Sequence, residues 1–144
     1  MKIEVREAPF NPWVEIEAYQ QSLAINGSYG ATATFVGTMR DFNEGDSVQA
    51  MTLEHYPGMT EKHLQKITDT AMQKWQLLDA LIIHRVGEIK PDDSIVLVAV
   101  WSAHRAQAFE ACRHIMEELK STAPFWKKEV LKDGSRWVGK NTPG

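Results

Sequence analysis

The sequence predicts an α+β fold in one domain that spans residues 1–144. Stretches that alternate like strands are interleaved with stretches that have helical spacing, and strand candidates often follow one another without a helix between them. No glycine-rich phosphate loop follows any strand, which argues against a doubly wound dinucleotide fold. A chain of 144 residues has room for one sizeable core. We therefore expect an α+β sandwich whose strands pair mainly antiparallel.

The N-terminal third predicts a strand, a helix and a long hairpin. Residues 2–5 alternate between polar and apolar types, as a strand does, and Asn11-Pro12 is typical of a helix start. The helix should end near Asn26-Gly27. Residues 29–39 and 48–56 are rich in strand-forming side chains and flank a polar loop, so we expect them to pair with each other.

The middle of the chain predicts a helix followed by two strands. Residues 60–75 place apolar side chains at helical intervals, and Thr60 is a candidate cap. Residues 80–86 and 94–101 are β-rich runs of strand length that are joined by a turn region.

The C-terminal part predicts the strongest helix and a final hairpin. Residues 103–122 keep an apolar face at helical spacing, and Pro124 ends the helix. Residues 125–131 and 136–138 are strand candidates on either side of a tight turn at Asp133-Gly134.

Composition limits the classes of function. The chain is 43% hydrophobic and 24% charged, and no apolar run approaches the ~20 residues of a membrane span. The first five residues lack the apolar block of a secretion signal, so we expect a cytoplasmic protein that does not bind a membrane. The formal net charge of −3 disfavours nucleic-acid binding.

Cysteine and histidine usage argues against a metal site. The single cysteine, Cys112, falls on the apolar face of the helix predicted for residues 103–122, where we expect a buried thiol. The five histidines are scattered and do not pair at metal-ligand spacing, so we predict no metal.

Two polar clusters lie where predicted strands end. Arg40 follows the first long strand and offers a planar fork of donors to phosphate or carboxylate, although a surface pair with Asp41 is the alternative. His104 and Arg105 lie at the start of a helix, where free N–H groups favour a bound anion. The alternative is two exposed first-turn side chains with Ser102 as the cap.

A third cluster is basic. Six Lys or Arg residues fall between Lys120 and Lys140, and two acidic residues oppose them. Lys120 lies at a helix C-terminus, so it could simply cap the helix. Lys127 and Lys128 should point to opposite faces of a strand, so only one of them can share a pocket with Lys120. Crowded cations lose proton affinity, and one lysine could therefore be neutral near physiological pH.

Five segments, in this order and at this spacing, resemble the large, catalytic subunit of molybdopterin synthases. They are residues 34–41, 53–59, 83–87, 102–112 and 124–129. The likeness extends from near Gly30 to Val138, which is most of the chain. It implies an α/β hammerhead fold with an additional small antiparallel sheet, and a homodimer at the centre of a heterotetramer.

The resemblance also implies an activity and a partner. In that family a small ubiquitin-like subunit carries sulfur as a thiocarboxylate on its C-terminal glycine, and its tail enters a pocket of the large subunit. Two sulfurs are transferred in turn to cyclic pyranopterin monophosphate, which gives the dithiolene of molybdopterin. The chain would then be a sulfurtransferase of molybdenum cofactor biosynthesis that needs no cofactor of its own.

The site residues that the resemblance implies come from the three clusters. Lys120 and Lys127 match the two lysines regarded as catalytic. Residues that match the substrate pocket are Thr38, Met39, Arg40, His104, Arg105, Lys128 and Glu129. The His104-Arg105 pair is supplied across the dimer to the other active site. Glu129 could orient a lysine, and a simple Lys–Glu surface pair is its alternative.

Two other functions would use the same residues. A non-catalytic dimeric module that binds a small anionic ligand needs the same Arg, His and Lys side chains. A scaffold that only binds the small partner's tail by strand addition is the other alternative.

Overall fold

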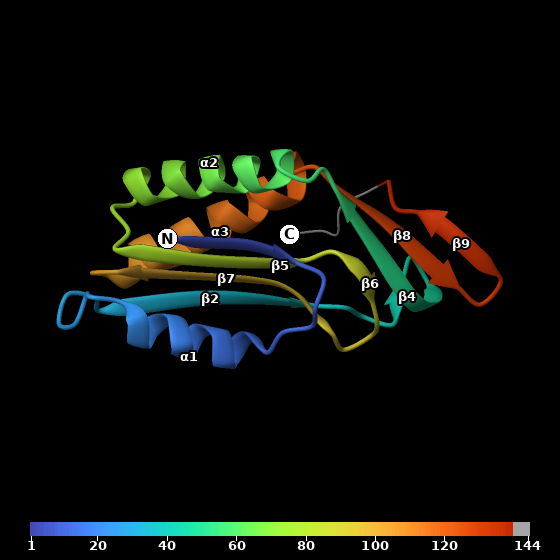
Figure 1. The fold of residues 1–144 in the computed structure, drawn as a ribbon, viewed down its shortest axis with the longest axis horizontal. Coiled ribbons are helices and arrows are strands. Elements are labelled where there is room, and N and C mark those ends of the chain that lie inside the picture. The colour runs from blue at the N-terminus through green and yellow to red at the C-terminus, as the bar shows by residue number, and fades with distance from the viewer. Residues whose placement is uncertain (140–144) are drawn as a thin grey trace.

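Two β-sheets and three helices make up residues 1–139, the part of the chain that the computed structural model describes (Figure 1). Lys140 lies outside this range. In chain order the elements are β1 (Lys2–Arg6), α1 (Pro12–Ser22), β2 (Ala31–Thr38), β3 (Phe42–Asn43), β4 (Asp46–His55), α2 (Met59–Lys74), β5 (Asp79–Arg85), β6 (Gly87–Ile89), β7 (Ser94–Ser102), α3 (Arg105–Thr122), β8 (Phe125–Leu131) and β9 (Gly134–Trp137).

The larger sheet lies between helices. Its strand order is β1-β5-β7-β2, with β1 parallel to β5 and the other neighbours antiparallel. Helices α2 and α3 cover one face, and α1 covers the other (Figure 1). Because both faces are covered, the central strands β5 and β7 are almost completely buried, and residues 80–83 and 95–101 within them are continuous apolar runs.

The smaller sheet lies at one end of the larger one (Figure 1). Its order is β3-β4-β8-β9, and β6 pairs with β4 as well. All of these pairings are antiparallel. The α+β prediction with mainly antiparallel strands and an additional small sheet is confirmed, as is the final hairpin of β8 and β9.

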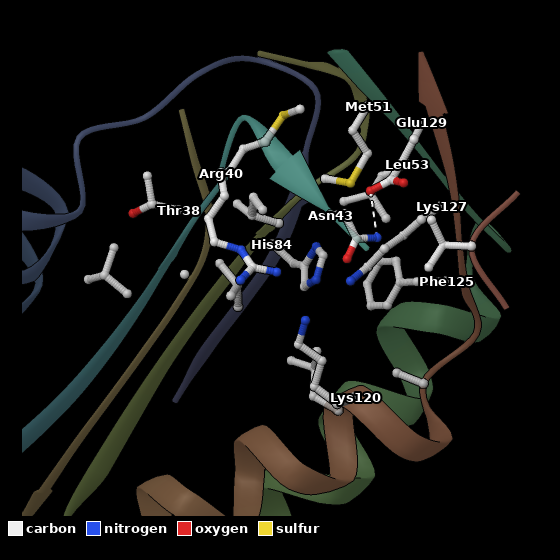
Figure 2. Close-up of a pocket in the computed structure, with 18 of the residues that line it drawn as sticks. Thr38, Arg40, Asn43, Met51, Leu53, His84, Lys120, Phe125, Lys127 and Glu129 are labelled. Carbon is white, nitrogen blue, oxygen red and sulfur yellow. Dashed lines mark hydrogen bonds between the residues drawn. The ribbon is translucent and has the colours of Figure 1, made fainter. Parts of the chain in front are cut away.

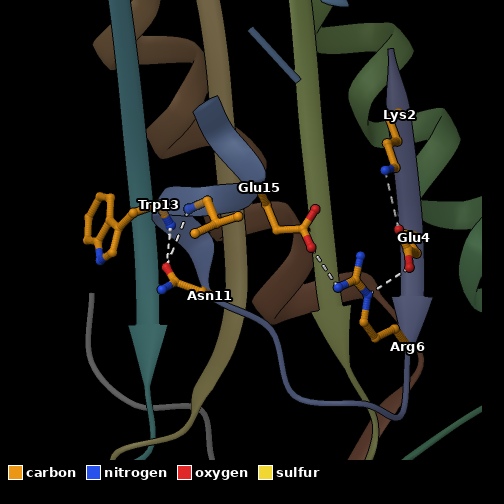
Figure 3. A network of polar contacts seen from close by, with 7 residues as sticks. Lys2, Glu4, Arg6, Asn11, Trp13 and Glu15 are labelled. Carbon is orange, nitrogen blue, oxygen red and sulfur yellow. Dashed lines mark hydrogen bonds and ion pairs between the residues drawn. The ribbon is translucent and has the colours of Figure 1, made fainter. Parts of the chain in front are cut away.

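The start of α1 follows its sequence signature. The Asn11 side chain accepts hydrogen bonds from the backbone N–H groups of Trp13, at 3.0 Å, and Val14, at 3.4 Å (Figure 3). Arg6 then ties β1 to this helix, because its guanidinium contacts Glu4 at 2.7 Å and Glu15 at 2.8 Å (Figure 3). The helix ends at Ser22, earlier than predicted.

The predicted pairing of the second and third long strands is wrong. Strand β2 pairs with β7, and β4 pairs with β8 in the other sheet. The chain leaves the larger sheet at Met39, whose backbone N–H donates to the carbonyl of Asp93 and whose carbonyl accepts from Asp92, both at 2.9 Å. The Met39 side chain is buried in the core of the smaller sheet, where it packs with residues of β4. Strand β4 therefore belongs to the smaller sheet.

Neither Thr60, the candidate cap of its helix, nor Ser102, the cap in the alternative interpretation of its segment, has a capping role. Thr60 lies inside α2, where its hydroxyl accepts from the N–H of Tyr56 and donates to the carbonyl of Pro124, each at 3.0 Å. Helix α3 begins after His104, and the hydroxyl of Ser102 donates to the carbonyl of that residue at 2.6 Å. The short strands β3 and β6 were not predicted.

Candidate functional site

A cavity of about 400 Å³ lies where the C-terminal end of α3 meets both sheets (Figure 2). The loop after β2, the end of β5, the last turn of α3 and strand β8 all contribute side chains to its wall. Six of the nine residues predicted for the site line this cavity: Thr38, Met39, Arg40, Lys120, Lys127 and Glu129. Segments that are far apart in the sequence therefore meet here.

The Thr38–Arg40 segment is held in place by close strand packing. A Cβ atom on Gly37 would lie 2.8 Å from a methyl group of Val96, so glycine permits β2 to approach β7 at this point. Beyond it, the buried Met39 anchors the turn, and the exposed Arg40 guanidinium lies 4.9 Å from the centre of the Phe42 ring. The turn thus directs Arg40 toward the cavity (Figure 2).

Two lysines point into the cavity from different elements. Lys120 comes from the last turn of α3, and Lys127 comes from β8 (Figure 2). Burial lowers the pKa of Lys127 to about 8, and the nearby cations of Lys120 and Arg40 act in the same direction. Glu129 opposes them. Lys127 can therefore exchange a proton near neutral pH.

The carboxylate of Glu129 is buried, and each of its oxygens accepts a hydrogen bond. Asn43 donates to one oxygen at 3.0 Å, and Arg136 donates to the other at 3.0 Å. Arg136 also contacts Asp46 at 2.8 Å, which links β9 to β4. The alternative of a simple surface pair between Glu129 and a lysine is therefore wrong, and Glu129 acts on Lys127 through its charge.

Lys128 is not part of this cavity. Because neighbouring strand residues alternate in direction, Lys127 faces the cavity and Lys128 faces away from it. The Lys128 ammonium lies 5.7 Å from the centre of the Trp137 ring instead. The expectation that only one of the two lysines shares a pocket with Lys120 is confirmed, whereas the placement of Lys128 in the pocket is wrong for a single chain.

His104 and Arg105 lie at the opposite end of α3 from Lys120. At 1.5 Å per residue, Arg105 and Lys120 are separated by about 22 Å along the helix axis. Both side chains at the start of the helix are exposed, and His104 makes no capping hydrogen bond with its side chain. They do not line the cavity of their own chain, so their supply across a dimer stays a prediction.

Two residues of the site were not predicted. His84, at the end of β5, lines the cavity beside Lys127, and Asn43 orients Glu129 (Figure 2). The alternation along β5 gives a usable signal for His84, because it shares the helix-facing side of the strand with Ala80 and Ile82. A polar residue on the helix-facing side of β5, close to the end of α3 that carries Lys120, either lines a functional site or is hydrogen-bonded within the core.

The geometry favours anion chemistry. Arg40, Lys120 and Lys127 bring three nitrogen-bearing side chains together in one partly enclosed space (Figure 2). Within residues 1–139, no group of three His, Cys, Asp or Glu side chains is placed to hold a metal ion. No helix in that range is long and apolar enough to cross a membrane.

Comparison with known proteins gives consistent matches. The family model described as MoaE protein matches residues 8–122. The molybdopterin synthase catalytic subunit of Ralstonia nicotianae is 57% identical over 94% of this chain and 76% of its own length. The crystal structure of molybdopterin synthase from Staphylococcus aureus has a TM-score of 0.85 at 35% identity, over 96% of this chain and 97% of that one.

A more distant structure shows the same fold. It is a chain from the Helicobacter pylori complex of subunits 1 and 2 of molybdopterin-converting factor, with a TM-score of 0.79 at 20% identity. It covers 96% of this chain and 90% of its own. With a family model that spans most of the sequence and a curated relative more than half identical, this chain belongs to the MoaE protein family.

Proposed function

We propose that this protein is the catalytic subunit of a molybdopterin synthase. It transfers sulfur from the C-terminal thiocarboxylate of a small ubiquitin-like partner to cyclic pyranopterin monophosphate and so forms the dithiolene of molybdopterin. The observation that carries this proposal is the convergence of Arg40, Lys120 and Lys127 in one cavity. A phosphate and a thiocarboxylate are both anions, and fixed cations are needed to bring them together.

The assembly is a homodimer that binds one small subunit at each end. The Helicobacter pylori protein of the same fold forms a complex of two subunits, which supports a two-component enzyme. A dimer also provides a place for His104 and Arg105, which are exposed and remote from the cavity of their own chain. We propose that each protomer supplies this pair to the substrate pocket of the other.

The substrate is held by the cationic side of the pocket. Arg40 binds the phosphate or the adjoining ring oxygens through its forked donors, together with His104 and Arg105 from the other protomer. Thr38 and Met39 shape the wall. Glu129 balances the charge of Lys127 from its buried pair with Arg136.

The two lysines have different tasks. After sulfur bonds to the pterin, the carrier's glycine must leave, and attack of water on the acyl carbon develops a negative charge on its oxygen. Lys120 stabilises that oxyanion as a fixed cation. Lys127, whose pKa of about 8 allows both protonation states, moves protons during ring opening and loss of water.

A reconstituted reaction tests the proposal. The chain is incubated with a thiocarboxylated ubiquitin-like protein and cyclic pyranopterin monophosphate, and the pterin is analysed by mass spectrometry. The expected product contains two sulfur atoms in place of oxygen. Binding of the pterin without any sulfur-containing product would identify a non-catalytic anion-binding module. Binding of the tail alone would identify a scaffold.

Replacing Cys112 with serine should leave sulfur transfer intact. The thiol is buried, and burial raises its pKa to about 11, so it is not a nucleophile near neutral pH. The serine hydroxyl is costly in an apolar core, so the melting temperature should fall. Thermal unfolding and the rate of dithiolene formation measure the two effects, and loss of transfer in a folded variant would contradict delivery of sulfur by the partner.

A cytoplasmic location is also part of the proposal. It agrees with the unpaired thiol of Cys112 and with the thiol-like chemistry of the sulfur donor. Fractionation of cells that produce the protein at its natural level tests it.

A further inference from the structure

His84 presents a hydrogen-bond acceptor to the cavity. Only 5% of the residue is exposed, and its Nδ1 atom lies 2.8 Å from the carbonyl oxygen of Arg85. A carbonyl can only accept, so Nδ1 carries the ring proton and donates it. The other nitrogen, Nε2, must then carry a lone pair.

The direction of that lone pair is fixed. The imidazole stacks on Phe125, with ring centres 3.9 Å apart and an angle of 14° between the planes. Figure 2 shows the ring on the cavity wall between Arg40 and Lys127, with Lys120 directed toward the same space. Among residues 1–139, Nε2 has no hydrogen-bonding partner. The atom is open to the cavity, where water can bond to it, so a ligand that displaces this water must supply a donor of its own or lose affinity.

The ring stays neutral in the pH range where the protein works. Burial lowers the pKa of His84 to about 4, and the charges of Lys120, Lys127 and His55 reinforce this effect. The cationic side chains around the cavity, Arg40 among them, are donors, whereas His84 remains an acceptor. Glu129 also lines the cavity, but each of its oxygens already accepts a hydrogen bond, one from Asn43 and one from Arg136.

We propose that His84 is a substrate-binding residue whose Nε2 accepts a hydrogen bond from an N–H or O–H group of the pterin ring system. The cations bind the anionic groups of the two substrates, and His84 binds the uncharged, hydrogen-bond-donating part of the pterin ring system. It thereby fixes which edge of the pterin faces Lys120 and Lys127. This inference rests on the proposed function, because it assigns one contact of the same substrate.

Two amide variants separate the two ring nitrogens. In His84→Asn the amide reaches the place of Nδ1 and keeps the bond to the Arg85 carbonyl, but it leaves the position of Nε2 empty. In His84→Gln the amide reaches the place of Nε2 and can offer its oxygen to the ligand. Both variants lose the aromatic stack with Phe125. Titration calorimetry with cyclic pyranopterin monophosphate should show about five- to tenfold weaker binding by the Asn variant than by the Gln variant.

Sulfate, an anion without an O–H donor at neutral pH, serves as the control ligand. It engages the cations and not His84, so its dissociation constant should be the same for wild type and both variants. Equal affinity of the two variants for the pterin, or a parallel loss of sulfate affinity, would overturn the assignment. A wild-type protein that forms no dithiolene would instead refute the proposed function, which is a separate outcome.

Nitrogen-15 NMR of the wild-type protein tests the same contact without any substitution. The resonance of an unprotonated Nε2 should shift when the pterin is added and remain in place when sulfate is added. An Nε2 chemical shift that does not change when the pterin is added would refute the inference, even if neither variant folds.

Discussion

Replacing Lys120 with alanine is expected to slow dithiolene formation by about 10²–10³-fold, the usual effect of removing one fixed donor to a developing oxyanion. The side chain reaches the cavity from the last turn of α3, and no ion pair to a carboxylate holds it among residues 1–139 (Figure 2). The loss should appear in the rate of sulfur release under saturating substrates. Single-turnover kinetics with the thiocarboxylated partner measure it.

The matched control for Lys120 lies on the same helix. Arg113 is 70% exposed and pairs only with Glu117 one turn further along, at 2.9 Å among the described residues. Arg113→Ala removes a cation of α3 without touching the cavity, so its rate should equal that of wild type. Near-normal turnover of Lys120→Ala would refute the role of Lys120. A rate loss of equal size in both variants would point to a general effect of charge on partner binding.

Local features of this fold were predictable from the sequence. The periodicity of α3, its basic last turn and the alternation of Lys127 and Lys128 depend only on neighbours within one element. The strand pairing was not predictable in the same way. The sequence of β4 by itself is compatible with pairing to β2 or to β8. The choice depends on Met39, whose side chain is buried in the core of the smaller sheet.

The site shows the same limit. Arg40, Lys120 and Lys127 could be proposed as a group because a family resemblance linked their segments. The role of His84 requires the packed structure, since it depends on the carbonyl of Arg85 and on the ring of Phe125, a residue of another strand. The pairing of Glu129 with Arg136 likewise depends on the β8–β9 register.

Replacing Lys127 with alanine should reduce the rate of dithiolene formation by about 10²–10⁴-fold, the contribution of a well-placed proton donor or acceptor. Lys128→Ala is the matched control, because the neighbouring lysine lies on the other face of β8 beside Trp137. That variant should keep most of its activity. A larger defect in Lys128→Ala than in Lys127→Ala would contradict the orientation of the strand.

The pH dependence of the wild-type rate should report the same lysine. If neutral Lys127 removes a proton, the rate rises from about pH 7 to about pH 9, with its midpoint near the Lys127 pKa of about 8. Glu129→Gln removes the negative charge that raises this pKa, so the midpoint should move to lower pH. A shift to higher pH, or a falling rate across this range, would refute Lys127 as the base.

Lys127 should also lower the stability of the folded protein. Its pKa is about 8 in the folded state and near the ordinary 10.5 in the unfolded chain, so between these values the unfolded chain binds more protons. Stability should therefore rise with pH in this window, and below it the cost of burying the charge is fully present. Lys127→Met should then be more stable than wild type at neutral pH, by on the order of 1–3 kcal/mol. Urea unfolding measures the difference in the free energy of unfolding. A variant that is more stable but inactive would show that burial of the Lys127 amine destabilises the fold and is needed for activity.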